Sequence, residues 1–236
     1  MTEFTYDPVY ITVFASVTFG YLFYWFLSKS TLLRNALSQK FSQRGVDLWQ
    51  PVIQRILGLV FLGVLPVIAM VIFTDISMVE LGINSKVGIE TIKYTSLLAA
   101  LIIPLSFLGA RSDDNLAQYP QIRLKEWTKG IFFMEYFTWA LYLLGYEVLF
   151  RGILLFGSLH FMTPEVAIGL NACIYAIVHI PKGVGESFGA IVLGIVLSYL
   201  TLLTGSVWIA FLVHIIMAWS NSFFSFRFQK EMKFIQ

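Results

Sequence analysis

Long apolar runs follow one another along most of the chain, and they constrain the fold more than any other feature. Hydrophobic residues make up 58% of the 236 positions and charged residues only 13%, far from the balance of a water-soluble domain. A helix needs roughly 20 apolar residues to cross a bilayer, and several runs reach that length. The sequence therefore predicts an all-α, polytopic transmembrane helical bundle.

About seven spans are expected, within a range of six to eight, because a split or re-entrant segment would change the count by one. The expected spans cover residues 9–28, 52–74, 94–110, 131–157, 164–180, 187–203 and 205–226. Very short connectors join the last three spans. These helices are therefore expected to be antiparallel neighbours.

Basic residues are concentrated in alternate connections between the spans. The basic-rich connections and the tail contain Lys29, Arg34, Lys40, Arg44, Arg111, Arg123, Lys125, Lys129, Lys182, Arg227, Lys230 and Lys233. The connections on the other side contain only Lys86 and Lys93. Because basic residues favour the cytoplasmic side, this pattern predicts an N-terminus outside and a C-terminus in the cytoplasm.

The chain divides into three parts. Residues 1–130 form an N-terminal transmembrane platform of three spans, residues 131–226 form a core, and residues 227–236 form a cytoplasmic tail. In the platform, residues 30–49 alternate apolar and basic positions at helical spacing, which suits either a helix on the membrane surface or a packed cytoplasmic helix. Residues 111–129 mix charges with a proline and predict a solvated loop.

Other partners and cross-links follow from composition. The only cysteine, Cys173, falls within an expected span, so no intramolecular disulfide can form. The net charge of +2 follows from the basic cytoplasmic connections and does not indicate nucleic acid as a partner. The lipid bilayer is the partner that the composition predicts.

Five ionisable side chains interrupt the apolar stretches of the core: Glu147, Arg151, His179, Glu186 and His214. A charge at bilayer depth costs at least about 2.5 to 3.5 kcal/mol on insertion scales, so such groups usually line a cavity, pair and mark function. These residues are therefore the candidate site.

Helical spacing relates several of these residues to one another. Glu147 and Arg151 are four positions apart and can form an ion pair, either for function or as a packing device. Glu135 lies three turns earlier and faces either the same cavity or a helix interface. Asn221 lies seven positions after His214 and shares its helix face.

The remaining two candidates each have a simpler structural explanation. His179 stands near a helix end, where a histidine is often a satisfied interfacial residue, and Glu186 opens the next helix, where a carboxylate complements the helix dipole. Histidines and carboxylates that meet in a cavity suit either water activation by a general base or a metal site made by His179, His214 and Glu147. No H-E-x-x-H motif is present.

From Ile131 to Phe226 the chain resembles the CPBP family of membrane proteins, which includes CAAX-processing prenyl endopeptidases and bacteriocin-immunity relatives. The family motifs are E-E-x-x-x-R, F-x-x-x-H and H-x-x-x-N. They correspond here to Tyr146-Glu147 with Arg151, to Tyr175 with His179, and to His214 with Ala218. The resemblance implies a CAAX-protease-like core in the C-terminal half.

Two positions depart from the family pattern. Tyr146 stands where the family has the Glu that activates water, and Ala218 stands where it has Asn. Glu147 is not a direct replacement, because one residue along a helix turns a side chain by about 100°. The chain is similar to a bacterial branch of the family that has an aromatic residue before a single Glu. His179, Lys182, Glu186 and Asn221 also match the motifs of that branch.

Two functions follow from the resemblance. The first is an intramembrane endopeptidase that hydrolyses membrane-associated peptides with Glu147, Arg151, His179, Glu186, His214 and Asn221 as its catalytic set. The second is a catalytically inactive member that acts as a membrane scaffold or as a regulatory subunit for a membrane protein partner. No cofactor is expected other than a divalent metal, in the alternative in which His179, His214 and Glu147 form a metal site. The resemblance implies a location in a bacterial cytoplasmic membrane. Transport is less favoured, because no second half repeats the first.

Overall fold

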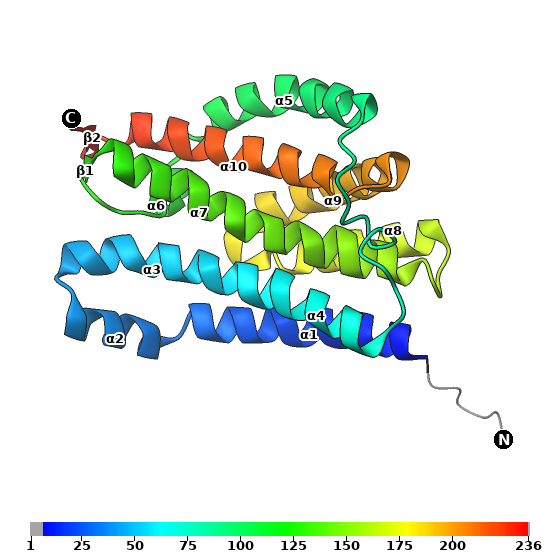
Figure 1. Ribbon diagram of the computed structural model, residues 1–236. Helices are drawn as coiled ribbons and strands as arrows, with labels where there is room; N and C mark the ends of the chain where they lie inside the picture. Colours follow the sequence, from blue (N-terminus) through cyan, green and yellow to red (C-terminus); the bar gives the residue numbers. More distant parts are fainter. Residues whose placement is uncertain (1–6, 236) are drawn as a thin grey trace.

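The computed structural model describes residues 7–235, and these form a bundle of long helices that lie roughly side by side (Figure 1). Its α-helices are α1 (Pro8–Ser28), α2 (Thr31–Lys40), α3 (Gln43–Gly58), α4 (Leu65–Phe73), α5 (Ile89–Gly109), α6 (Asp113–Gln118), α7 (Lys129–Glu147), α8 (Pro164–Ile177), α9 (Val184–Thr204) and α10 (Trp208–Phe228). The π-helical segments η1 (Leu59–Val64) and η2 (Val148–Phe156) continue α3 and α7, and the short η3 (Ile180–Lys182) follows α8. The two strands are β1 (Glu126–Trp127) and β2 (Lys233–Phe234).

Among the described residues, 6 helices are long and apolar enough to cross a membrane. The all-α polytopic bundle and the range of six to eight spans are therefore confirmed. The expected span at 164–180 is shorter than predicted, because α8 has only 14 residues before the chain turns at Pro181. At 1.5 Å per residue, α8 measures about 21 Å, less than the hydrocarbon thickness of about 30 Å.

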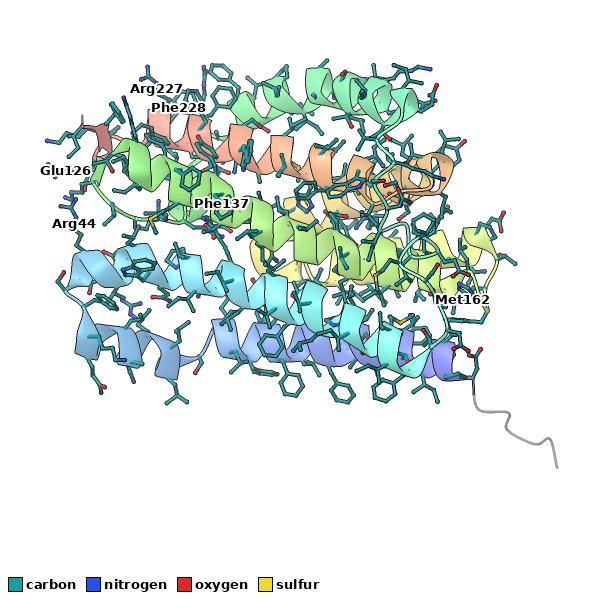
Figure 2. All side chains as sticks on the ribbon, in the orientation of Figure 1. Arg44, Glu126, Phe137, Met162, Arg227 and Phe228 are labelled. Carbon is teal, nitrogen blue, oxygen red and sulfur yellow. The ribbon has the colours of Figure 1, made fainter. Side chains whose placement is uncertain are left out.

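The chain runs back and forth along the bundle, so that the first described residues and the C-terminal strand lie at opposite ends (Figure 1). Arg44, Glu126 and Arg227 lie together at one end, and Met162 lies at the other (Figure 2). The helix ends that carry most of the basic residues therefore share one end of the molecule.

The combined helix α7–η2 is the centre of the bundle. Of the membrane-spanning candidates it has the largest buried share, 72% of its most apolar window. Its side chains Leu149, Ile153 and Leu154 are fully buried in the main core cluster. The residues of η2 that follow Glu147 are consequently shielded from lipid by the other helices.

Backbone contact between glycines brings η1 against α7 just before the candidate site. A Cβ atom on Gly63 would lie 2.8 Å from the Cα of Gly145, and one on Gly145 would lie 2.8 Å from the Cα of Leu59. Real Cβ atoms do not approach other atoms so closely, so both positions require glycine for this packing. The contact fixes the height of η1 relative to the end of α7.

The end of the bundle that carries the basic residues is more ordered than the sequence indicates. The segment 30–49 forms α2 and the first turns of α3, which pack on each other and bury Leu37 and Val46, as the packed-helix alternative requires. The expected solvated loop at 111–129 is wrong for its second half, where Ile122, Leu124 and Trp127 enter a hydrophobic cluster. Apolar residues spaced between charges provide the burial that outweighs the polar composition.

The last residues of the chain also join this end of the molecule. Strand β2 pairs in parallel with β1, with Glu126 opposite Lys233 and Trp127 opposite Phe234. The tail that follows α10 is therefore docked beside the start of α7.

Candidate active site

A buried carboxylate joins two distant helices in the middle of the bundle. Glu147 is the last residue of α7 and is fully buried. Its Oε1 lies 2.6 Å from Nδ1 of His214 on α10, and its Oε2 lies 3.4 Å from Nη1 of Arg151 on η2. The predicted pairing of Glu147 with Arg151 is therefore present, and His214 belongs to the same cluster.

Arg151 is the permanent charge of this cluster. Its side chain is fully buried, and its guanidinium lies 4.6 Å from the centre of the Tyr175 ring. A guanidinium in proteins stays protonated and is attracted to the face of an aromatic ring. Glu147 and the Tyr175 ring together therefore compensate for a charge that would otherwise be very costly at this depth.

His179 has a different partner from His214. It follows the end of α8, and its Nδ1 lies 2.7 Å from the backbone oxygen of Tyr175. A carbonyl oxygen only accepts hydrogen bonds, so Nδ1 carries the hydrogen and Nε2 keeps its lone pair. Nδ1 of His214 faces Oε1 of Glu147, which accepts a hydrogen bond from Nδ1 when the carboxyl group is ionised.

The two imidazoles converge on the same pair of aromatic rings. The Tyr146 ring centre lies 6.4 Å from that of His179 and 5.6 Å from that of His214. The corresponding distances for Tyr175 are 4.6 Å and 6.4 Å. Tyr146, which stands where the family has its first Glu, therefore lies between the two histidines. Its buried hydroxyl has no hydrogen-bond partner among the described residues.

Both histidines line a cavity of about 1090 Å³. Only 8% of His179 and 7% of His214 is exposed, and the described residues provide no hydrogen-bond partner for either Nε2. Nε2 of each histidine is therefore available to form a hydrogen bond with a molecule in the cavity. This arrangement can accept hydrogen bonds and protons at the cavity wall.

Glu186 and Asn221 also line the cavity but lie outside the Glu147 cluster. Glu186 pairs with Lys182, with 3.5 Å between Oε2 and Nζ, and its side chain is 40% exposed. Asn221 and Ala218 border the cavity from α10 without a described hydrogen bond to the histidines. Of the sequence-predicted residues, His179, Glu186, His214 and Asn221 line the cavity, whereas Glu147 and Arg151 do not. Only Glu147, Arg151 and His214 are in direct contact with one another.

The described residues contain no group of three or more His, Cys, Asp or Glu side chains arranged to hold a metal ion. The set of His179, His214 and Glu147 is accordingly not assembled as a metal site in this structure.

The sequence indicates only one partner, Glu135, of a second buried ion pair. Glu135 is fully buried at the interface of three helices, and its Oε2 lies 2.8 Å from Nη2 of Arg55 on α3. Trp139 and Ser222 donate to Oε1 of the same carboxylate, and Arg55 donates to the hydroxyl of Thr138. Arg55 was not predicted as its partner, although a charged residue so close to the start of an apolar run indicates a buried and paired charge.

Asn171 is another buried polar residue that sequence reasoning missed. Its side chain, on α8, donates to the backbone oxygen of Phe150 inside η2 and accepts a hydrogen bond of 3.2 Å from Ser198 on α9. It therefore connects the backbone next to Arg151 with two neighbouring helices. An amide within an apolar stretch was the available signal.

Comparison with known proteins gives one match. Residues 128–220 match the family model described as Type II CAAX prenyl endopeptidase Rce1-like, a segment that contains Glu147, Arg151, His179 and His214. No curated protein matches the chain, and no solved structure does. The motifs, their order and this match agree, and the C-terminal core of the chain belongs to the CPBP family of CAAX-protease-type membrane proteins.

Proposed function

We propose that the protein is an intramembrane endopeptidase that hydrolyses membrane-associated peptides, with His214 as the general base. The observation that carries this proposal is the distance of 2.6 Å between Nδ1 of His214 and Oε1 of Glu147. A carboxylate on one ring nitrogen fixes the tautomer and raises the basicity of the other nitrogen. Nε2 of His214 is the nitrogen left for chemistry at the cavity.

The reaction proceeds by addition and elimination. Nε2 of His214 takes a proton from a water molecule while the water oxygen bonds to the peptide carbonyl carbon, which gives a tetrahedral oxyanion. The imidazolium then donates that proton to the amide nitrogen as the C–N bond breaks, which yields a carboxylic acid and an amine. Glu147 stays ionised throughout and stabilises the imidazolium.

The neighbouring residues support this cycle. Arg151 keeps Glu147 ionised and in place, because its own charge is permanent. The lone pair on Nε2 of His179 orients the water by accepting its second hydrogen. The Tyr146 hydroxyl has no hydrogen-bond partner among the described residues and its ring centre lies 5.6 Å from that of His214, so it donates to the oxyanion. Glu186 and Asn221 line the cavity and contact the substrate rather than the reacting atoms.

The second candidate function is a catalytically inactive scaffold or regulatory subunit for a membrane protein. The replacement of the first family Glu by Tyr146, and of the third-motif Asn by Ala218, favours this alternative. The partner would then bind the cavity or the lipid-facing helices without being cleaved.

One experiment separates the two functions. The full chain, the Glu147→Gln variant and the His214→Ala variant are purified in bilayer nanodiscs together with their native membrane peptides. Mass spectrometry then identifies cleaved products and associated proteins. Products that form only with the wild type support the endopeptidase, whereas the same uncleaved partner in all three samples supports the scaffold.

The proposed setting is a bacterial cytoplasmic membrane, with the N-terminus outside and the C-terminus in the cytoplasm. The position of Arg44 and Arg227 at the same end of the bundle supports this orientation (Figure 2). Labelling of an introduced Lys40→Cys in a Cys173→Ser background by an impermeant maleimide tests it. Reaction of this cysteine in intact cells would show that the orientation is the opposite of the one proposed.

A further inference from the structure

The cavity is not enclosed evenly by the helices around it. Helix α5 lies at the edge of the bundle and packs mainly along α10 (Figure 1). It meets α9 in a cluster that contains Ile102 of α5 and Leu197 and Leu200 of α9. That cluster closes one end of the space between α5 and α9.

Beyond that cluster the cavity extends between the C-terminal half of α5 and the N-terminal half of α9. The residues of α5 and α9 that line it are Ile102, Leu105, Ser106, Gly109, Val184, Gly185, Glu186, Gly189, Ala190 and Leu193. Two of them have largely exposed side chains, with 56% of Leu105 and 75% of Val184 accessible. Because these residues line the cavity and are also accessible at the outer surface, they mark an opening toward the lipid.

Gly185 and Gly189 leave α9 without side chains at two positions of this wall. A Cβ atom added to Gly185 or Gly189 would meet nothing within 4 Å. Further along the same helix, a Cβ on Gly194 would lie 3.2 Å from the Cα of Ala172, so that glycine serves helix packing. The two earlier glycines serve no contact of this kind, and their positions leave open space beside the cavity.

The opening leads to the unpaired nitrogen of His214. His214 is more than nine-tenths buried, yet it lines the same cavity as Gly189. Met217 and Ala218, one turn further on α10, also line the cavity and are apolar. Together with Leu105, Val184 and Leu193 they give an apolar chain a surface to contact inside this cavity.

The opposite side of the cavity has a different character. There α1 and α3 contribute side chains that can form hydrogen bonds, including Tyr24, Gln50 and Gln54. His214 thus lines a cavity that has both apolar and polar walls. This division fits a chain that changes from apolar to polar at the point of cleavage.

We propose that the opening between residues 102–109 of α5 and residues 184–193 of α9 is the entrance for the apolar segment of a membrane-anchored peptide. Gly185 and Gly189 set the width of this entrance and so determine which side chains pass. The proposal rests on the proposed function for its substrate, a peptide cleaved where an apolar anchor meets a polar segment. The open space beside both glycines and the presence of His214 on the same cavity are the observations that carry it.

Photo-crosslinking tests the entrance without requiring turnover. The probe is a synthetic peptide with a polar segment joined to a run of roughly 20 leucines and alanines, long enough to insert in a bilayer, with one photo-leucine near the junction. It is added to the His214→Ala protein in nanodiscs, and the crosslinked residues are mapped by mass spectrometry. Crosslinks are expected on residues 102–109 and 184–193.

Matched variants decide whether the glycines define the entrance. Gly189→Phe on α9 and Leu105→Trp on the facing helix each narrow the opening, and the crosslinks are expected to be lost in both. Gly169→Phe is the control, because Gly169 also has nothing within 4 Å of its Cβ position but does not line the cavity. Size-exclusion profiles of all variants verify that they fold.

The outcomes separate this inference from the proposed function. Crosslinks that persist in Gly189→Phe, that map to other residues than 102–109 and 184–193, or that are absent altogether overturn the entrance. Cleavage of the same probe by wild-type protein is measured in parallel. Crosslinks at the entrance without cleavage would leave the entrance in place and count against the endopeptidase.

Discussion

The side chains of Glu147 and His214 lie 2.6 Å apart although 67 positions separate them in the chain. One comes from the end of α7 and the other from the middle of α10, so the contact exists only when the bundle is folded. The carboxylate directs Nδ1 of the imidazole away from the cavity and leaves Nε2 for a substrate. This arrangement makes a histidine the strongest candidate for the base in a chain whose first family Glu is Tyr146.

Loss of Arg151 should destabilise the whole fold. Arg151→Met leaves the carboxylate of Glu147 buried without its cationic partner, and breaking such a pair costs about 3–5 kcal/mol. Thermal unfolding in detergent, followed by circular dichroism, should show a clearly lowered midpoint. Lys125→Met is the control, because its exposed pair with Glu231 should contribute nothing measurable. Equal midpoints for the two variants would contradict the buried pair.

The Arg55–Glu135 pair should behave as a coupled unit. Each single change, Arg55→Met or Glu135→Met, leaves one buried charge uncompensated and should cost about 3–5 kcal/mol. The double variant removes both charges and should recover much of that loss. Urea unfolding of the four proteins measures the coupling. Additive losses in the double variant would show that the two charges do not interact.

Asn171 should stabilise the backbone beside Arg151. Asn171→Ala leaves the Phe150 oxygen without its side-chain donor, and a buried unsatisfied group costs about 1–3 kcal/mol. Ser198→Ala removes only the bond to the Asn171 oxygen and should cost less. Unfolding midpoints of both variants test this order. A larger loss for Ser198→Ala would mean that the Phe150 contact is unimportant.

The contact between Gly63 and Gly145 should not tolerate a methyl group. Gly145→Ala puts a Cβ 2.8 Å from the Leu59 backbone, so η1 must move, and such overpacking typically costs about 1–3 kcal/mol. Gly169→Ala has open space and should be slightly stabilising, by about 0.5–1 kcal/mol, because alanine favours the helix. Thermal midpoints that fall together in both variants would argue against close packing of η1 on α7.

The sequence predicts the spans well where composition alone decides them. Long apolar runs locate α1, α5, α7, α9 and α10 within a few residues, because a bilayer requires such runs. It fails at α8, where the stop at Pro181 outweighs the apolar composition. It also fails at Ile122, Leu124 and Trp127, which are buried by segments far away in the sequence.

The site is predicted in its members but not in its contacts. Spacing along one helix identifies the Glu147–Arg151 pair, since four positions place both side chains on one face. Spacing cannot identify the contact of Glu147 with His214 or of Glu135 with Arg55, because these join different helices. Glu186 was predicted as a site residue, and its ion-pair partner is Lys182, four positions earlier in the chain.

The measurement that tests the account most directly is the rate at which the purified protein in nanodiscs cleaves a peptide with an apolar anchor and a polar segment. Wild type, Glu147→Gln, His214→Ala and the control Glu165→Gln are compared, with product formation followed by mass spectrometry. Removing a general base or its orienting carboxylate should slow hydrolysis by about 100-fold or more, while Glu165→Gln, at an exposed residue that does not line the cavity, should retain most of the rate. Cleavage by Glu147→Gln and His214→Ala at the wild-type rate, or no cleavage by any of the four, would contradict the assignment.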